Sequence, residues 1–366
     1  MKRICVWMMC LLLLAGTAGA EVHVLPLVTW TPTAAPTVTP TAAPTAEPTA
    51  VPTAAPTAAP TAETTAAPAS DAPAKNRKTE AKPLLLLTGT VETEESTLSL
   101  PLDLSKGMPL VKANYLTPLH YKDPTIEMEA REVHEGDVRY WVGEVAIGHP
   151  TQLRTMPATN FTSSATANGG ALSRRANAVL SCDGDYWWRD VKWKGNYVLR
   201  QGQLYMHTLI GRSDLLLINE DGDFRIIHKA TEETAPMPET EGGPVYYEGK
   251  RIYNALCFGP ALVENGQALP IEPDDWIITD QKAGRLAIAQ TGHLKYMIVA
   301  SYNQSLTLAE FADLLVKLGA QTAYNLDGGN SAMMFTGRNM INVNRSTREI
   351  GDLIYFASAW PEGGNP

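Results

Sequence analysis

The sequence predicts an α+β fold: a mixed, strand-rich sheet domain with few helices, preceded by a disordered Pro/Thr linker. Short runs rich in β-branched and aromatic residues, bounded by turn residues, recur from about residue 125 onward. Only one stretch, residues 307–318, has helical spacing with both ends marked. Between residues 32 and 60 a proline stands at every fourth position, and this segment has nothing to bury.

The first 20 residues predict export. Lys2 and Arg3 precede an apolar stretch at residues 4–15, and Ala18-Gly19-Ala20 supplies small residues for cleavage. These are the three parts of a secretory signal peptide. The apolar stretch is too short for a stable membrane span, although a retained anchor is an alternative. We therefore expect a secreted or extracytoplasmic protein.

Residues 21–83 predict a spacer, and residues 84–120 a lead-in to the globular part. The spacer is rich in Pro, Thr and Ala, which favours an extended, polyproline-like conformation. Such a spacer suits a domain held at a cell surface or associated with a cell wall. The main domain is expected at residues 121–366, long enough for a large core.

Net charge and cysteine content limit the possible binding partners and the possible disulfide bonds. The formal charge of -9 argues against nucleic acid as a partner. Without the leader, the chain keeps Cys182 and Cys257. They form either one disulfide or two free thiols, and two cysteines are too few for a disulfide scaffold.

Strands are predicted in order along the domain. Residues 125–132 and 139–147 are joined by a hairpin at residues 134–137, and a polar loop follows at residues 160–171. Further strands are expected at residues 196–204, 214–218, 253–263, 294–301, 322–326 and 352–359.

The one predicted helix leads to the most informative run. Thr307 and Glu310 form a capping box, and Gly319 is a natural residue to end the helix. The following strand ends at Asp327-Gly328-Gly329, where the side chains turn polar. Because ligands bind where strands end at their carboxyl side, this run is a candidate site. A plain tight turn is the alternative.

A second run repeats this pattern. A strand of small residues ends at Asp183-Gly184-Asp185, and aromatic residues follow from Tyr186. Rings beside carboxylates suit sugar recognition, because sugar C–H faces stack on rings while hydroxyls need polar acceptors. The alternative is a turn followed by ordinary core aromatics.

Two arginines are candidates for binding phosphate. Arg285 stands at the head of an apolar strand, and Arg348 lies in a polar, basic loop with Asn342, Asn344 and Arg345. A planar guanidinium binds two phosphate oxygens at once. A solvated strand end is the alternative for Arg285.

Taken together, these runs resemble the phosphodiester glycosidase family. The most specific piece is Asn325-Leu326-Asp327-Gly328-Gly329 after a helix, and the resemblance extends from about residue 121 to the end. It implies a secreted or lumenal hydrolase that cleaves the sugar C–O bond of a glycosyl-1-phosphodiester. The expected substrate is a glycosyl phosphate or a surface polysaccharide or glycan.

The site hypothesis follows from these residue types. Asp327 would stabilise an oxocarbenium-like centre or activate water, Asp185 would be its partner, and Arg285 would hold the phosphate. The residues expected to bind substrate around them are Asn325, Gly328, Gly329, Asn330, Ser331, Arg348, Asp183 and Tyr186.

Two positions depart from the family pattern. Asn330 stands where the family has a glycine after Asp-Gly-Gly, which adds bulk beside the ligand. Asp183 stands where the family has asparagine, which adds a charge near Asp185 and would raise the pKa of one carboxyl if the two lie close together.

Two other functions stay open at this point. One is a non-catalytic module that binds a cell wall or exopolysaccharide, the natural reading if Asn330 spoils the site. The other is a metal-dependent phosphodiesterase that cleaves P–O. No cofactor is expected for the glycosidase, whereas the phosphodiesterase would need a divalent cation. The histidines lack the spacing of metal ligands: His134, His149, His207, His228 and His293.

Overall fold

The structure is a computed structural model. It describes residues 90–92, 97–99, 109–185, 196–209, 214–273, 277–302, 305–342 and 347–360, which all belong to one compact unit at residues 75–366. The predictions for the leader and the spacer lie outside the described residues. Within the described part, no helix combines the length and apolar character needed to cross a membrane.

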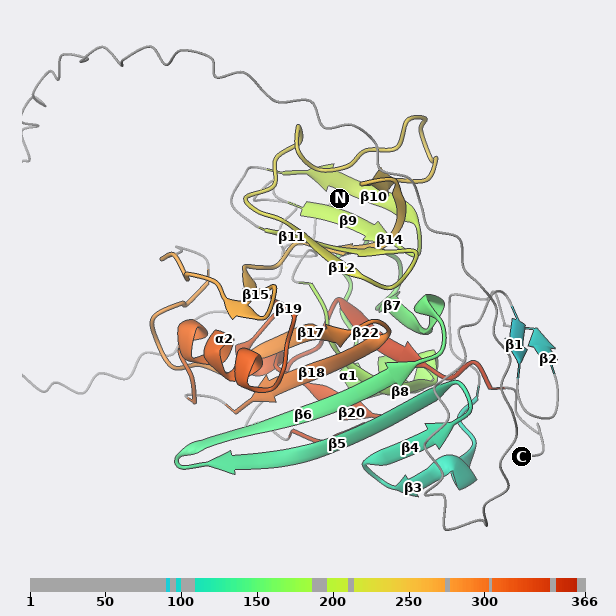
Figure 1. Cartoon of the computed structure of the whole chain (residues 1–366), viewed down its shortest axis with the longest axis vertical. Coiled ribbons are helices and arrows are strands. Elements are labelled where there is room, and N and C mark those ends of the chain that lie inside the picture. Colours follow the sequence, from blue (N-terminus) through green and yellow to red (C-terminus); the bar gives the residue numbers. More distant parts are fainter. Residues whose placement is uncertain are drawn as a thin grey trace, which may run out of the picture. The chain divides into compact units, whose positions relative to one another are not determined.

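The α+β, strand-rich fold is confirmed, and three sheets form most of it (Figure 1). In spatial order, the nine-stranded sheet contains β16 (Gln267–Ala268), β15 (Ala261–Glu264), β19 (Thr322–Asn325), β17 (Leu286–Gly292), β18 (Lys295–Ser301), β6 (Val138–Ile147), β5 (Ile126–Glu135), β4 (His120–Asp123) and β3 (Tyr115–Thr117). Every strand pair described in this sheet is antiparallel.

Two further sheets pack against it. The five-stranded sheet has the order β21 (Asn339–Met340), β20 (Met334–Thr336), β8 (Ala178–Asp183), β22 (Asp352–Ala357) and β7 (Leu153–Pro157). The six-stranded sheet has β10 (Gln203–Thr208), β9 (Asn196–Arg200), β14 (Lys250–Leu256), β11 (Leu215–Asn219) and β12 (Phe224–Ile227), with β13 (Tyr246–Tyr247) beside β14. Apart from these, β1 (Thr90–Glu92) pairs with β2 (Thr97–Ser99).

The predicted helix is confirmed as α2 (Leu308–Lys317). Its capping box is complete, because the Thr307 hydroxyl accepts from the Glu310 N–H and the Glu310 carboxylate accepts from the Thr307 N–H. Its apolar side packs on one face of the nine-stranded sheet, against residues such as Ala287 and Val299. The helix connects β18 to β19, which run in the same direction with β17 between them. This connection delivers Asp327 to the end of a central strand.

A second helix, α1 (Gly169–Ala176), replaces part of the loop expected at residues 160–171. The Asn168 side chain accepts from the Ala171 N–H, and Asn177 ends the helix with φ 50°. Two glycines at the start concealed this helix because glycine disfavours helices. Gly169 is required by packing, since a Cβ there would lie 2.6 Å from the Phe335 ring.

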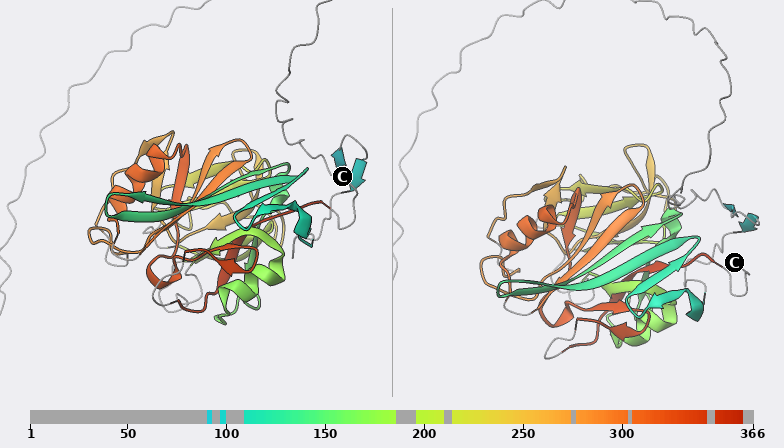
Figure 2. Two further views of the ribbon diagram at one scale, coloured as in Figure 1. Left: turned by 90° about the horizontal axis from the view of Figure 1, so that it is seen from below. Right: turned by 60° about the horizontal axis from the view of Figure 1, so that its bottom comes forward.

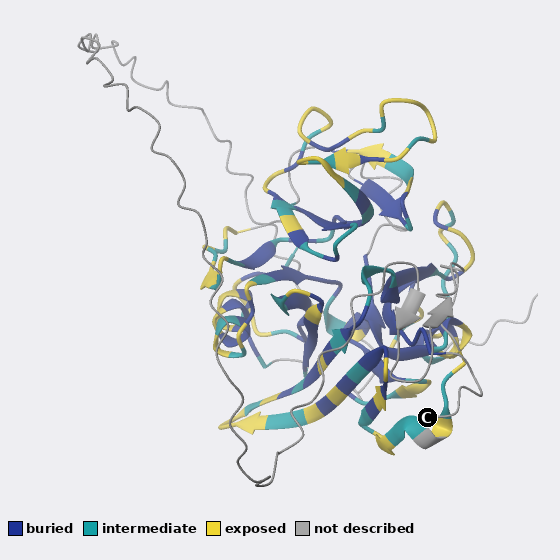
Figure 3. Cartoon of the chain, turned by 45° about the vertical axis from the view of Figure 1, so that its right-hand side comes forward, coloured by how far each residue is buried: buried dark blue, intermediate teal, exposed yellow. Residues whose placement is uncertain are grey.

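Alternation along β22 shows how the layers are arranged. Leu353 and Tyr355 pack with α1, whereas Ile354 and Phe356 belong to the central core. That core also takes side chains from the other two sheets. Figure 3 shows buried residues through the middle of the strands and exposed ones at the tip of the β5–β6 hairpin.

Three buried rings, one from each sheet, join the layers. The Tyr296 ring of β18 lies 5.5 Å from the Phe224 ring of β12 and 5.4 Å from the Phe356 ring of β22. Such contacts stabilise by about 0.5–1.5 kcal/mol each beyond area burial. The Tyr296 hydroxyl donates to the Gly222 carbonyl at 2.7 Å, so its buried polar atom is satisfied. The further views in Figure 2 show the three sheets gathered around this interior.

The two cysteines are free thiols within the described part of the chain. Cys182 lies in β8 and Cys257 directly follows β14, so they belong to different sheets. Burial raises the pKa of the Cys182 thiol well above its usual value. Of the two alternatives left by the sequence, the structure shows the free thiols.

Candidate active site

Ends of strands from all three sheets meet at one cluster of charged side chains. Asp183 is the last residue of β8, Arg200 the last of β9, and Asp352 the first of β22, while Asp327 follows β19 by two residues. All four are buried. Charges at this depth require partners, and the partners divide the cluster into two groups.

The first group joins Asp327, Arg348 and Ser331. One Nη of Arg348 donates to a carboxylate oxygen of Asp327, and its Nε donates to the hydroxyl of Ser331. The side chain of Asp327 is 11% exposed and that of Arg348 is 31% exposed. This ion pair is therefore within reach of solvent, and the guanidinium holds two groups supplied by the Asp-Gly-Gly run.

The two glycines of that run have separate structural reasons. A Cβ at Gly328 would lie 2.6 Å from the backbone oxygen of Gly284, so only glycine allows this approach. Gly329 has φ +59° and donates its N–H to the same Gly284 oxygen at 2.8 Å. The turn fixes Asp327 beside the strand that begins near Arg285.

The same turn contacts the second acidic run. The Asp327 N–H donates to the Gly184 carbonyl at 3.4 Å, and the Ser331 hydroxyl is hydrogen-bonded to Asp183. The structure thus brings together two runs that are far apart in the sequence. Burial, followed by the charges of Asp327 and Asp352, raises the pKa of Asp183 well above its usual value. The sequence had predicted that the charge of Asp185 would be the neighbouring charge that raises a carboxyl pKa here; the structure shows Asp327 and Asp352 instead.

The second group joins Asp185, Arg200 and Asp352. Arg200 Nη2 lies 2.8 Å from Asp185 Oδ2 and 3.3 Å from Asp352 Oδ2, and all three side chains have no exposed surface. Asp185 also accepts from the backbone N–H groups of Cys257 and Phe258, at 2.9 and 3.0 Å. These contacts join the five-stranded sheet to the six-stranded sheet.

Comparison with known sequences decides the family. The sequence model of the phosphodiester glycosidases matches residues 164–357, more than half of the chain and the span that contains both groups. The chain belongs to the phosphodiester glycosidase family. No curated protein matches it.

Three solved structures are among those that the chain matches in a structural comparison. The catalytic domain of zebrafish N-acetylglucosamine-1-phosphodiester alpha-N-acetylglucosaminidase, auto-inhibited by its pro-peptide, is 12% identical over 69% of this chain and 87% of that chain, with a TM-score of 0.48. A hypothetical protein from Synechocystis is 17% identical over 63% of this chain and 62% of its own, with a TM-score of 0.44. An exported protein from Burkholderia pseudomallei is 13% identical over 60% and 74%, with a TM-score of 0.39.

The backbone of Arg285 lies beside the Asp327-Gly328-Gly329 turn, but its guanidinium contacts backbone carbonyls of other segments. Its Nε donates to the Leu306 carbonyl at 3.1 Å and its Nη2 to the Gln281 carbonyl at 2.7 Å. Its N–H donates to the Ser301 hydroxyl. The guanidinium therefore fastens the segments before β17 and α2. Burial lowers its pKa from the usual value.

The remaining predicted residues fall into three situations. Asn325 is buried and its Nδ2 donates to the Gly259 carbonyl at 2.7 Å, whereas Asn330 is exposed beside the Asp327 turn. Tyr186 lies outside the described residues.

The sequence did not predict the buried roles of Arg200 and Asp352. Each is a charged residue at the end of an otherwise apolar strand. This pattern could have indicated a buried charge, but it is equally typical of a charged residue that is exposed at a strand end.

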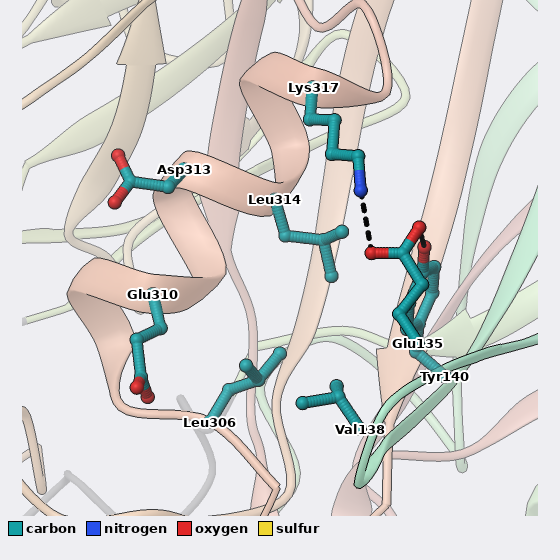
Figure 4. Close-up of a pocket in the computed structure, with 8 residues that line it drawn as sticks. All are labelled: Glu135, Val138, Tyr140, Leu306, Glu310, Asp313, Leu314 and Lys317. Carbon is teal, nitrogen blue, oxygen red and sulfur yellow. Dashed lines mark hydrogen bonds and ion pairs between the residues drawn. The ribbon is translucent and has the colours of Figure 1, made fainter.

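A separate groove lies between α2 and the β5–β6 hairpin (Figure 4). Tyr140, Leu306 and Leu314 line it, and Lys317 Nζ spans it to Glu135 Oε2 at 2.7 Å. None of the predicted site residues contributes to its lining. Among the residues that the structure describes, no group of three His, Cys, Asp or Glu side chains is placed to hold a metal ion.

Proposed function

We propose that this protein hydrolyses the sugar C–O bond of a glycosyl-1-phosphodiester, with Asp327 as the reacting carboxylate and Arg348 as the phosphate-binding residue. Membership of the phosphodiester glycosidase family supports the reaction class. The observation that carries the assignment is the accessible ion pair between Asp327 and Arg348. It places the two groups that this chemistry needs within one contact of each other.

The leaving group explains why one carboxylate and one guanidinium suffice. Cleavage expels a phosphomonoester, which leaves readily without strong general-acid help. The reaction needs a cation for the departing phosphate and a carboxylate for the developing positive charge at the anomeric carbon. Arg348 and Asp327 supply these two charges.

Substrate binding would rearrange the pair. The phosphodiester anion competes with Asp327 for the guanidinium, which binds two oxygens in one plane. Asp327 is then available to take a proton from water or to attack the anomeric carbon itself. If Asp327 takes the proton, the water oxygen bonds to the anomeric carbon as the bond from that carbon to the phosphate oxygen breaks and the phosphomonoester departs. If Asp327 attacks, its bond to the anomeric carbon forms as the phosphomonoester departs, and water then replaces Asp327 on that carbon and restores the free carboxyl group.

Asp185 and Arg285 support the site rather than react in it. The carboxylate of Asp185 already accepts one guanidinium and two backbone N–H groups, and it has no exposed surface. The guanidinium of Arg285 is occupied by backbone carbonyls. We therefore assign both the task of holding the chain segments that carry Asp327.

We further propose that the protein is exported and acts on a surface polysaccharide or glycan. The leader-like residues 1–20 and the proline-rich spacer support this setting. A binding module without catalysis is the second candidate. It is favoured by the exposed Asn330 beside Asp327, where the family pattern has glycine.

A panel of 4-nitrophenyl phosphodiesters of glucose, mannose and N-acetylglucosamine 1-phosphate tests the proposal. Cleavage of the sugar C–O bond releases 4-nitrophenyl phosphate, which gives colour only after a phosphatase is added. Direct release of 4-nitrophenol indicates cleavage of P–O to the aryl group, and loss of turnover with a chelator indicates a metal-dependent reaction. Binding without either product favours the module. Asp327→Asn should slow the appearance of phosphatase-dependent colour by about 10²- to 10⁴-fold.

A further inference from the structure

Asp183 differs from the other carboxylates of the cluster in its partners. It is 2% exposed, and its Oδ1 accepts from the Gly184 N–H at 2.9 Å. The Ser331 hydroxyl is hydrogen-bonded to the same side chain. Within the described part of the chain, no Lys, Arg or His forms an ion pair with it.

The charges that face Asp183 are mainly negative. The carboxylates of Asp327, beyond β19, and of Asp352, in β22, both act on it, whereas the buried thiol of Cys182 in its own strand has a raised pKa and adds no charge. The two nearby cations contact other carboxylates: Arg348 contacts Asp327, and Arg200 contacts Asp185 and Asp352. The described cluster therefore holds four carboxyls and two guanidiniums. An ionised Asp183 would add a further negative charge beside the place where an anionic phosphodiester would bind.

Ser331 links Asp183 to the phosphate-binding group. Its hydroxyl oxygen accepts from Arg348 Nε, while the hydroxyl is also hydrogen-bonded to Asp183. A neutral carboxyl donates its own proton to the Ser331 oxygen, which leaves the Ser331 hydrogen available for a phosphate oxygen. An ionised carboxylate instead takes that hydrogen.

We propose that Asp183 is a positioning residue that works as a neutral carboxyl: it holds Ser331, and through it Arg348, without adding negative charge where the phosphodiester binds. This inference rests on the proposed function. Burial and the two neighbouring carboxylates, which raise the pKa of Asp183, favour the neutral form. Binding of the anion is then coupled to a proton on Asp183.

The variants Asp183→Asn and Asp183→Ala distinguish the effect of a neutral side chain at position 183 from the effect of its hydrogen bond to Ser331. The amide of Asp183→Asn keeps the shape and stays neutral, so KM should remain within about threefold of the wild-type value at low pH. For the wild type, KM should rise with pH above the Asp183 pKa, towards tenfold per pH unit, and this rise should be absent in Asp183→Asn. Asp183→Ala should raise KM at all pH values, because Ser331 loses its holder. Asp123→Asn is the matched control, since Asp123 is another buried aspartate with a raised pKa, and it should keep the wild-type pH profile.

Binding of C-glycosyl phosphonate analogues of the same 4-nitrophenyl diesters, in which CH2 replaces the oxygen between sugar and phosphorus so that no sugar C–O bond can be cleaved, is measured by calorimetry in buffers of different ionisation enthalpy and gives a readout without turnover. These phosphonate esters do not titrate near neutral pH, so any proton taken up on binding belongs to the protein. Up to one proton should be taken up by the wild type and none by Asp183→Asn. Uptake that persists in Asp183→Asn, or an Asp183→Asn variant as impaired as Asp183→Ala, would overturn this inference while turnover still supported the proposed function. Failure to bind any diester would contradict both.

Discussion

Arg348 and Asp327 form an ion pair whose side chains are 31% and 11% exposed, whereas the side chains of Asp185, Arg200 and Asp352 have no exposed surface. Arg348 precedes β22, and Asp327 follows β19 in a different sheet. Asp183 is influenced by both Asp327 and Asp352, so the accessible pair and the fully buried Arg200 group belong to one cluster of charges. Charged groups held in place by such contacts before a ligand arrives are what oriented binding of a charged ligand requires.

Replacing Asp327 by Asn should reduce kcat by about 10²- to 10⁴-fold, the range typical of a lost catalytic carboxyl group. The volume is nearly unchanged, so the unfolding midpoint should stay near that of the wild type. Steady-state rates on the diester panel and thermal unfolding measure the two effects. Asp123→Asn serves as the matched control with normal kcat. Full activity in Asp327→Asn would remove this residue from the mechanism.

Arg348→Lys should raise KM by about 10- to 100-fold, because a hydrogen bond to a charged group contributes roughly 1.5–3 kcal/mol. A lysine ammonium is a single point and cannot contact Asp327 and Ser331 together as the planar guanidinium does. Arg285→Lys offers the comparison, since its guanidinium contacts backbone carbonyls. Equal KM changes in the two variants would argue against a special role for Arg348.

Asp185→Asn should lower the free energy of unfolding by about 3–5 kcal/mol, because Arg200 would keep a buried charge with one partner weakened. Glu135→Gln breaks the exposed pair with Lys317, where both side chains are more than 40% exposed, and should change the free energy of unfolding far less than Asp185→Asn does. Denaturant unfolding measures both. A small effect at Asp185 would contradict its structural assignment.

Gly328→Ala should destabilise the protein by about 1–3 kcal/mol, because the new Cβ would lie 2.6 Å from a backbone oxygen that has little room to move. Gly329→Ala should suffer from its positive φ instead, and Gly329→Asn should be milder because asparagine tolerates that region. Activity should fall furthest in Gly328→Ala, since the shift displaces Asp327. Equal tolerance at both positions would show that the turn is adaptable.

The raised pKa of Asp183 also predicts a pH-dependent stability difference. Its folded pKa lies above its unfolded value, so the stability it contributes is complete below the unfolded pKa and is lost as pH rises through the folded pKa. Asp183→Asn removes this loss. The unfolding free energy of the variant should therefore gain on the wild type as pH rises from about 4, by at most about 1.4 kcal/mol per pH unit. A difference that does not change with pH would contradict the assigned direction.

Local patterns made part of this structure predictable. The capping box of Thr307 and Glu310 and the glycines after Asp327 depend on neighbours in the sequence, and the structure has the helix and the turn where these residues predict them. The contact of Arg348 with Asp327 depends on how separate sheets meet. The sequence showed both residues as candidates but not their pairing. Arg200 and Asp352 were missed because their burial follows only from that meeting of sheets.

The direct test of the central claim uses a 4-nitrophenyl diester that the enzyme cleaves. The diester is hydrolysed in ¹⁸O-labelled water, and the products are analysed by mass spectrometry. Attack at the anomeric carbon predicts that the released 4-nitrophenyl phosphate contains no ¹⁸O and that Asp327→Asn forms this product about 10²- to 10⁴-fold more slowly. Label in the released phosphate would show attack at phosphorus. That result would contradict the roles given to Asp327 and Arg348.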